Sequence, residues 1–437
     1  MRSIDPPRRH ERTRSGSRAR AFAALALTTT MAIAGCGTLT PTSSATAPAT
    51  PPPTAAPPTA PAPSASFRAA AEVYAEIRTE VEAIRGLQPT KAVEPVSLDE
   101  SQLKTNLAAD FDKENTAAEL KLAQDELITL GLLPVGSDLR KIQLDFQAGQ
   151  VAGYYSPEKD QLYVVSRSGG LGGAEMSTYA HEFTHQLDDQ VLGLDKLGLD
   201  VPDQSDRQLA RLALVEGDAT SVQSTYMTTE LTPQQLGEVL AAASDPGALA
   251  ALQNAPPYVR ETALFPYQTG LAFVSALLAQ GGYTAVDAAF KDPPNSTEQV
   301  LHPEKYAARE APSTVEIPAG VATKLGTGWT TAGYDTLGEL LLGIWLKQGG
   351  VTPVVAATAA AGWGGDRLLV VRGPAGAVGV GLITTWDTAA DATEFAAAAT
   401  TAVSAFDAGG KVAADGARTV VVAMGARAAD MLAALAH

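Results

Sequence analysis

The sequence has few cysteines, aromatic residues and histidines, and the first two shortages limit how the chain can be built. Cys36 is the only cysteine in 437 residues, so no intramolecular disulfide framework is possible. Aromatic residues make up 6 % of the chain and hydrophobic residues 45 %. We therefore expect a core built largely from Ala, Val and Leu, large enough for more than one domain.

Positive charge is scarce outside the first twenty residues. The chain has 32 basic and 48 acidic residues, a formal net charge of −16, and seven of its arginines lie in residues 1–20. This balance argues against nucleic acid as a partner, because phosphate backbones are neutralised by Lys and Arg. It also argues against a broad electrostatic contact with anionic lipid.

Residues 1–35 predict an export signal. A basic segment precedes an apolar run over 21–33, which is too short and too interrupted by threonine for a membrane span. The run ends in Ile33-Ala34-Gly35-Cys36, which resembles the lipobox of bacterial lipoproteins. That resemblance implies cleavage before Cys36 and a lipid on its thiol; the alternatives are a buried cysteine or an uncleaved anchor. Residues 36–66, rich in Pro, Ala and Thr, then predict a tether that holds a folded domain outside the cell.

Hydrophobic periodicity predicts an α+β fold in which helices dominate. A main domain is expected over 67–330, with a small antiparallel sheet before the motif described below. A smaller α+β domain is expected over 331–437. Helical spacing occurs at 67–87, 99–131, 175–193, 205–228, 232–243, 263–280, 283–290, 335–348, 388–406 and 425–435. Strand patterns occur at 142–146, 151–155, 161–165, 367–372, 376–385 and 417–423.

The segment His181-Glu182-Phe183-Thr184-His185 carries the clearest indication of chemistry. Histidines four residues apart share one face of a helix, so both rings can bind one metal ion. Glu182 can act on a metal-held water without binding the metal itself. The alternative is an exposed helix without a site, but with five histidines in the chain this pattern rarely arises by chance. We expect one zinc ion per chain at His181 and His185.

This segment resembles the HExxH motif of the zincin metallopeptidases. In the gluzincin branch, which includes thermolysin-like enzymes, a second helix donates a glutamate, and 212–220 looks like that helix. The resemblance implies Glu216, 31 residues after His185, as the third zinc ligand. It also implies Glu182 as the general base and a zincin-like domain over 67–330 that acts on a peptide or protein substrate. An exposed glutamate on an amphipathic helix is the alternative for Glu216.

The sequence departs from the thermolysin pattern in the residues that would support the ligands. Four residues after the glutamate, where those enzymes carry an aspartate that orients a histidine, this chain has Thr220. The candidates for that task are Asp188, Asp189 and Asp218.

Zincins also stabilise the oxyanion with a later His or Tyr, and they bind substrate along an edge strand. His302 is the candidate for the oxyanion, with a structural loop role as the alternative, and Tyr267 is a weaker one. The strand at 161–165 is the candidate edge.

The predicted function is a zinc metallopeptidase, anchored outside the cell through Cys36. Two alternatives stay open. One is a metal-dependent hydrolase of a non-peptide substrate, because the same residues can attack other acyl groups. The other is a surface-anchored binding or assembly protein with a vestigial zinc site, although such a site has no need for Glu182.

Overall fold

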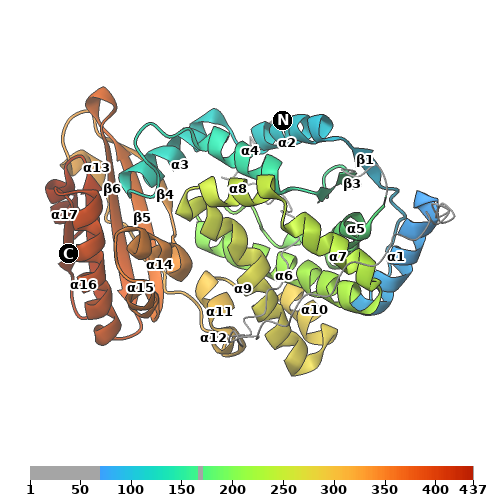
Figure 1. Cartoon of the computed structure of the whole chain (residues 1–437). Coiled ribbons are helices and arrows are strands. Elements are labelled where there is room, and N and C mark those ends of the chain that lie inside the picture. Colours follow the sequence, from blue (N-terminus) through green and yellow to red (C-terminus); the bar gives the residue numbers. More distant parts are fainter. Residues whose placement is uncertain (1–68, 166–170, 437) are drawn as a thin grey trace, which may run out of the picture.

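The computed structural model describes residues 69–165 and 171–436, and its fold is α+β (Figure 1). A helical body carries a small three-stranded sheet, and the C-terminal part forms a five-stranded sheet with its own helices. The predicted export signal, Cys36 and the tether lie outside the described residues.

Three of the first four helices begin at residues whose side chains cap them. The helices are α1 (Ala70–Arg85), α2 (Glu100–Glu114), α3 (Ala117–Thr129) and α4 (Leu139–Gln150). Capping boxes at Asp99 and Thr116 start α2 and α3, because each side chain accepts from a backbone N–H three residues later. The helix predicted at 67–87 is confirmed, and the helical pattern at 99–131 corresponds to the pair α2 and α3.

The strand predicted at 142–146 is wrong, because these residues belong to α4. The Asp138 side chain accepts from the N–H of Lys141 and caps the helix. Leu139 and Phe146, seven residues apart and therefore on one helical face, are both buried. Ile142 packs against the same cluster as Phe146, so two of the three alternating apolar residues share one helical face.

The small sheet consists of β1 (Val96–Leu98), β2 (Gly153–Ser156) and β3 (Gln161–Val165), in the order β1-β3-β2. The antiparallel pairing of β2 with β3 is confirmed, and β1 adds a parallel neighbour on the other side of β3. Since β3 is the central strand, it has no free edge. The prediction that residues 161–165 pair with a substrate peptide is therefore wrong.

The middle of the chain forms the helical body. Its helices are α5 (Gly173–Leu187), a π turn (Asp188–Leu192), a 3-10 turn (Leu194–Lys196), α6 (Ser205–Thr229), α7 (Pro233–Ala243), α8 (Pro246–Asn254), α9 (Pro257–Gly281) and α10 (Tyr283–Lys291). Among the described helices, α9 is long and apolar enough to cross a membrane. Its residues Phe273, Val274 and Leu277 are buried in one cluster with residues of α6, which is the place of a core helix.

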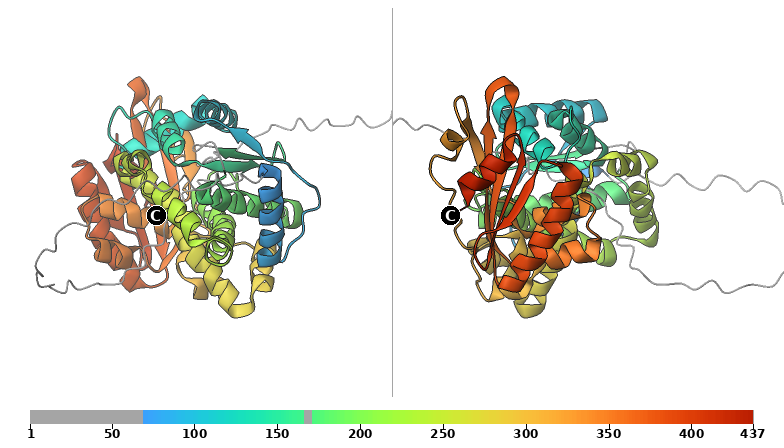
Figure 2. Two further views of the ribbon diagram at one scale, coloured as in Figure 1. Left: turned by 45° about the vertical axis from the view of Figure 1, so that its right-hand side comes forward. Right: turned by 90° about the vertical axis from the view of Figure 1, so that its left-hand side faces the viewer.

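The C-terminal part places helices on both faces of an antiparallel sheet (Figure 2). The strands are β4 (Thr330–Asp335), β5 (Trp363–Arg372), β6 (Val378–Trp386), β7 (Lys411–Ala414) and β8 (Thr419–Gly425), in the order β4-β5-β6-β8-β7. One face packs on α14 (Gly338–Gln348), α15 (Pro353–Ala360) and α16 (Ala389–Phe406). The other packs on α13 (Val321–Lys324) and α17 (Ala428–Leu435). Short helices α11 (Thr297–Leu301) and α12 (Pro303–Ala307) precede this part, and a 3-10 turn (Pro374–Gly376) joins β5 to β6.

One hydrophobic core joins the C-terminal sheet to the helical body. Leu127 of α3, Phe146 of α4 and Leu209 of α6 belong to the same buried cluster as Val370 of β5. The indole N–H of Trp345 on α14 donates to the carbonyl of Leu130 at 3.0 Å. The sheet therefore shares its core with α3 and α4, which lie more than 200 residues before β5.

Candidate metal centre

His181, His185 and Glu216 meet at one buried point. Their side chains come from α5 and α6, and one ligand atom of each lies within 4.8 Å of the others. The two histidine Nε2 atoms are 3.0 Å apart. Glu216 Oε2 is 3.2 Å from the Nε2 of His181 and 3.3 Å from that of His185. We call these three residues the His/His/Glu cluster.

The spacing and the donor types of this cluster fit a zinc ion. Zinc binds imidazole nitrogen at about 2.0–2.1 Å in a tetrahedral arrangement, which places two ligand atoms about 3.3 Å apart. The three separations, 3.0, 3.2 and 3.3 Å, are close to that value. Two nitrogens and one carboxylate oxygen form a donor set that zinc prefers and that leaves a fourth position.

The packing of α6 on α9 brings Glu216 to α5. Gly217 of α6 and Gly270 of α9 touch: a Cβ on Gly217 would lie 2.3 Å from the carbonyl oxygen of Gly270. A Cβ on Gly270 would lie 2.2 Å from the carbonyl oxygen of Ala213. Only glycine allows such an approach of two helices. The position of Glu216 therefore depends on two glycines that lie outside the predicted set of site residues.

Glu182 lies beside the cluster, with its carboxylate held by the small sheet. Its Oε2 accepts from the backbone N–H of Tyr155 in β2 at 2.8 Å, and the side chain is fully buried. A Cβ on Gly153 would meet Thr178 and the carbonyl of Tyr163, both at 2.8 Å, so glycine lets β2 approach α5 here. Within the described residues, Glu182 Oε1 has no hydrogen-bond partner.

Burial and mutual attraction set the protonation of these groups. Burial lowers the pKa of His181. For His185 burial also acts to lower the pKa, but the carboxylates of Glu216, Glu182 and Asp188 together outweigh it and raise the pKa to about 9. Burial acts to raise the pKa of Glu216, and the two histidines outweigh it and lower the pKa to about 2. Burial raises the pKa of Glu182 to about 8.

The structure separates the two candidates for the oxyanion. His302 lies between α11 and α12, and its Nε2 is 2.9 Å from the carboxylate of Glu339 on α14. This pairing supports the structural loop role for His302. The ring of Tyr267 on α9 instead lies beside the cluster, 6.2 Å from the His181 ring between centroids and at 26° to it.

A buried arginine lies behind the cluster. Arg85, the last residue of α1, donates from Nε to Asp218 at 2.7 Å, and its Nη2 lies 2.7 Å from Asp287 and 3.7 Å from Asp188. The guanidinium also lies over the ring of Tyr283, 4.7 Å from the centroid. Asp188 and Asp218, two of the three predicted supporting residues, therefore share one cation. The third, Asp189, accepts instead from the hydroxyl of Tyr155 at 3.0 Å.

A second group of acidic residues, Glu298, Glu310 and Asp387, also has metal-ligand spacing. The ammonium of Lys305 bonds to all three, at 2.6, 2.9 and 2.7 Å. This group is therefore explained as a lysine with three carboxylate partners.

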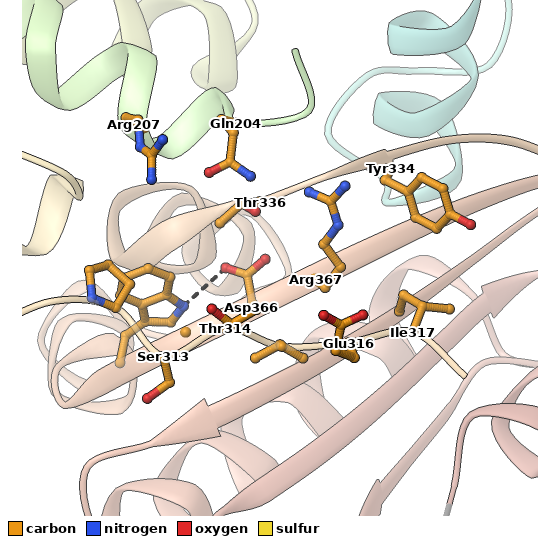
Figure 3. Close-up of a pocket in the computed structure, with 14 residues that line it drawn as sticks. Gln204, Arg207, Ser313, Thr314, Glu316, Ile317, Tyr334, Thr336, Asp366 and Arg367 are labelled. Atoms are coloured by element: carbon orange, nitrogen blue, oxygen red, sulfur yellow. Dashed lines mark hydrogen bonds between the residues drawn. The ribbon is translucent and has the colours of Figure 1, made fainter. Parts of the chain in front are cut away.

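A polar cavity of about 480 Å³ lies between the start of α6 and the C-terminal sheet (Figure 3). Arg207 approaches it from α6, Arg367 and Asp366 line it from β5, and the segment 312–317 closes it. Arg207 and Glu216 are nine residues apart and thus on opposite faces of α6. No residue of the His/His/Glu cluster lines this cavity.

The similarity to known families concerns only the C-terminal part. Residues 325–434 match a family described as a domain of unknown function (DUF8575). No curated protein and no solved structure matches the chain. The matched segment contains the five-stranded sheet and none of His181, His185 and Glu216. A function for the cluster therefore has to be argued from its own geometry.

Proposed function

We propose that this chain is a zinc metallopeptidase. The observation that carries the proposal is that two histidine nitrogens and a carboxylate oxygen lie within 3.3 Å of one another in the protein interior. A further buried carboxylate, that of Glu182, follows His181 on the same helix. His181, His185 and Glu216 would hold one zinc ion. A bound zinc ion acts as a Lewis acid that lowers the pKa of water and polarises a carbonyl.

Glu182 serves as the general base and then as the proton donor to the leaving amine. The N–H of Tyr155 fixes one of its oxygens, and the second oxygen, Oε1, is left to take a proton from the attacking water. A pKa raised to about 8 suits both tasks, because a group that titrates near the working pH can accept a proton and give it back. This role distinguishes an active site from a vestigial one.

Tyr267 supplies the hydroxyl that stabilises the negative oxygen of the tetrahedral intermediate. Its ring lies beside that of His181, on the turn of α9 just before Gly270, where α9 and α6 touch. A donor fixed by helix packing pays no reorganisation cost when charge develops. His302 is assigned no part in the chemistry.

The enzyme acts outside the cell on a peptide or protein substrate and is held at the membrane by a lipid on Cys36. The lipobox-like Ile33-Ala34-Gly35-Cys36 supports this location. Cells fed a fatty-acid analogue should label the wild-type protein and not Cys36→Ala. Label that persists in the variant contradicts the anchor and leaves the site chemistry untouched.

The deciding experiment compares the purified wild type with Glu182→Gln on a peptide library. The wild type should bind about one zinc ion and cleave peptides. The variant should keep its zinc and lose about 10²–10⁴-fold in kcat, the usual contribution of a general base. Undiminished turnover would exclude the role of Glu182. A zinc-loaded wild type that cleaves esters but no peptide would favour the non-peptide hydrolase.

A further inference from the structure

Asp188 has no role in the proposed chemistry, although it lies close to a proposed zinc ligand in the sequence. It follows His185 by three residues and His181 by seven, so all three lie on one face of the same helical stretch. Its side chain is fully buried. Side chains on a helix lean toward its N-terminus, so the carboxylate of Asp188 leans back over His185.

Three buried polar atoms at this point have no hydrogen-bond partner among the described residues. They are Nδ1 of His185 and both carboxylate oxygens of Asp188. Buried polar atoms are nearly always paired, because an unpaired one forfeits its hydration without compensation. His185 and Asp188 lie close enough for their charges to interact, so the unpaired imidazole N–H and the unpaired carboxylate are candidates to bond to each other.

An ion pair links Asp188 to Arg85 of α1. Its Nη2 is 3.7 Å from Asp188 Oδ1, while its Nε donates to Asp218 at 2.7 Å. The guanidinium is itself completely buried and lies over the ring of Tyr283. The guanidinium therefore offsets part of the cost of burying Asp188, although burial still raises the pKa of that carboxyl group above its usual range.

From these contacts we infer that Asp188, held by Arg85, is a positioning residue that accepts the Nδ1–H of His185 and so presents Nε2 of that ring to the metal. The inference rests on the proposed zinc site. It gives α1 a part in the metal centre and names the carboxylate that replaces the aspartate missing at Thr220.

The competing explanation is that Arg85 and its aspartates only stabilise the fold. Asp287 separates the two explanations. It lies on α10, 2.7 Å from the same Nη2 atom that is 3.7 Å from Asp188, and 30 % of its side chain is exposed. A purely structural cluster should respond alike to the loss of either carboxylate, whereas a positioning role belongs to Asp188 alone.

The test measures zinc affinity with a chromophoric chelator as competitor, and thermal stability of the metal-free protein, in the wild type, Asp188→Ala, Asp188→Asn and Asp287→Ala. Asp188→Ala should weaken zinc binding about 10–100-fold, the usual effect of losing such a partner. Asp188→Asn keeps a carbonyl oxygen in the same place and should recover part of that loss. Asp287→Ala should leave zinc affinity unchanged, whatever it does to stability.

The cobalt-substituted proteins provide a second measurement. The visible absorption of bound Co²⁺ depends on ligand orientation, so Asp188→Ala should change the spectrum and Asp287→Ala should not. Equal effects of the two alanine variants on zinc affinity, or no effect of Asp188→Ala, would overturn the inference while the wild type still binds zinc. A wild type that takes up no zinc would overturn the proposed function and this inference together.

Discussion

The charge of His185 in the metal-free protein should determine how the proposed zinc binding depends on pH. Burial acts to lower the pKa of His185, but the carboxylates of Glu216, Glu182 and Asp188 together outweigh it and raise the pKa to about 9. Zinc binds the neutral ring, so below that pH each zinc ion must displace one proton. The apparent zinc affinity should rise about tenfold per pH unit between pH 6 and 8 and level off above about pH 9.

Chelator competition across this pH range measures the slope. Glu182→Gln is the control, since Glu182 also titrates in this range, with a pKa of about 8. The slope between pH 6 and 8 should persist in this variant, because Glu216 still raises the pKa of His185, while the pH at which the affinity levels off should fall, because Glu182 contributes to that shift. A flat profile in the wild type would mean that His185 is already neutral.

Tyr267 and His302 should differ in their effect on turnover. Tyr267→Phe removes the hydroxyl proposed to face the oxyanion and should lower kcat by about 10²–10³-fold, the usual cost of losing one such donor. His302→Gln changes a ring whose Nε2 lies 2.9 Å from Glu339 and should leave kcat unchanged. Zinc content should stay near one in both variants. The reverse pattern would restore His302 as the oxyanion donor.

At this scale the sequence predicted the candidate site residues and missed two residues that contact the site. His181, Glu182, His185 and Glu216 lie in motifs with fixed spacing, and the structure brings them together. Arg85 contacts Asp218 across 133 residues of sequence, and Tyr155 reaches Glu182 through its backbone N–H. Neither contact leaves a local pattern in the sequence.

The crossing of α6 and α9 depends on the absence of side chains at Gly217 and Gly270. Gly270→Ala places a methyl group 2.2 Å from a backbone carbonyl, which cannot move aside as a side chain could. The helices must separate, and the free energy of unfolding should fall by about 1–3 kcal/mol or more. Because Glu216 is displaced with α6, zinc affinity should fall too. Urea denaturation of the metal-free variant and chelator competition measure the two effects.

Gly237→Ala in α7 is the matched control for this change. It is also a helical glycine, but an added Cβ would have no atom within 4 Å. The substitution should stabilise the protein by about 0.5–1 kcal/mol, because alanine loses less conformational freedom than glycine on folding. If Gly270→Ala stabilises to the same extent, the close helix crossing is wrong.

Elements with long periodic patterns could be predicted, and short ones could not. The helices at 205–228 and 232–243 were predicted within a few residues of α6 and α7. The strand β1 has three residues and depends on its pairing with β3, so its own pattern carries little information. Residues 142–146 were misassigned because five residues are too few to separate the two periods. Ile142 and Phe146, the first and last apolar residues of the alternation, also share one face of α4.

The first turn of α6 connects the C-terminal sheet to the helical body. Asp335, at the end of β4, accepts from the N–H of Ser205 at 3.0 Å and from its hydroxyl at 2.6 Å. Leu209 lies in the core that the C-terminal sheet shares with α3 and α4. The same helix carries Glu216, so the sheet and the metal centre should unfold together.

The tryptophans allow this coupling to be measured, because all four (Trp329, Trp345, Trp363 and Trp386) lie in the C-terminal part. Their fluorescence reports on this part, whereas the proposed zinc ligands lie in the helical body. Zinc at about a thousand times its Kd should add about 4 kcal/mol to the free energy of unfolding. If the chain is one cooperative unit, the tryptophan melting midpoint should rise by several degrees, equal to the shift seen by circular dichroism.

His185→Ala, which lacks one of the proposed zinc ligands, should show no zinc-induced shift by either probe. A zinc shift seen by circular dichroism but not by tryptophan fluorescence would mean that the sheet unfolds independently of the metal centre.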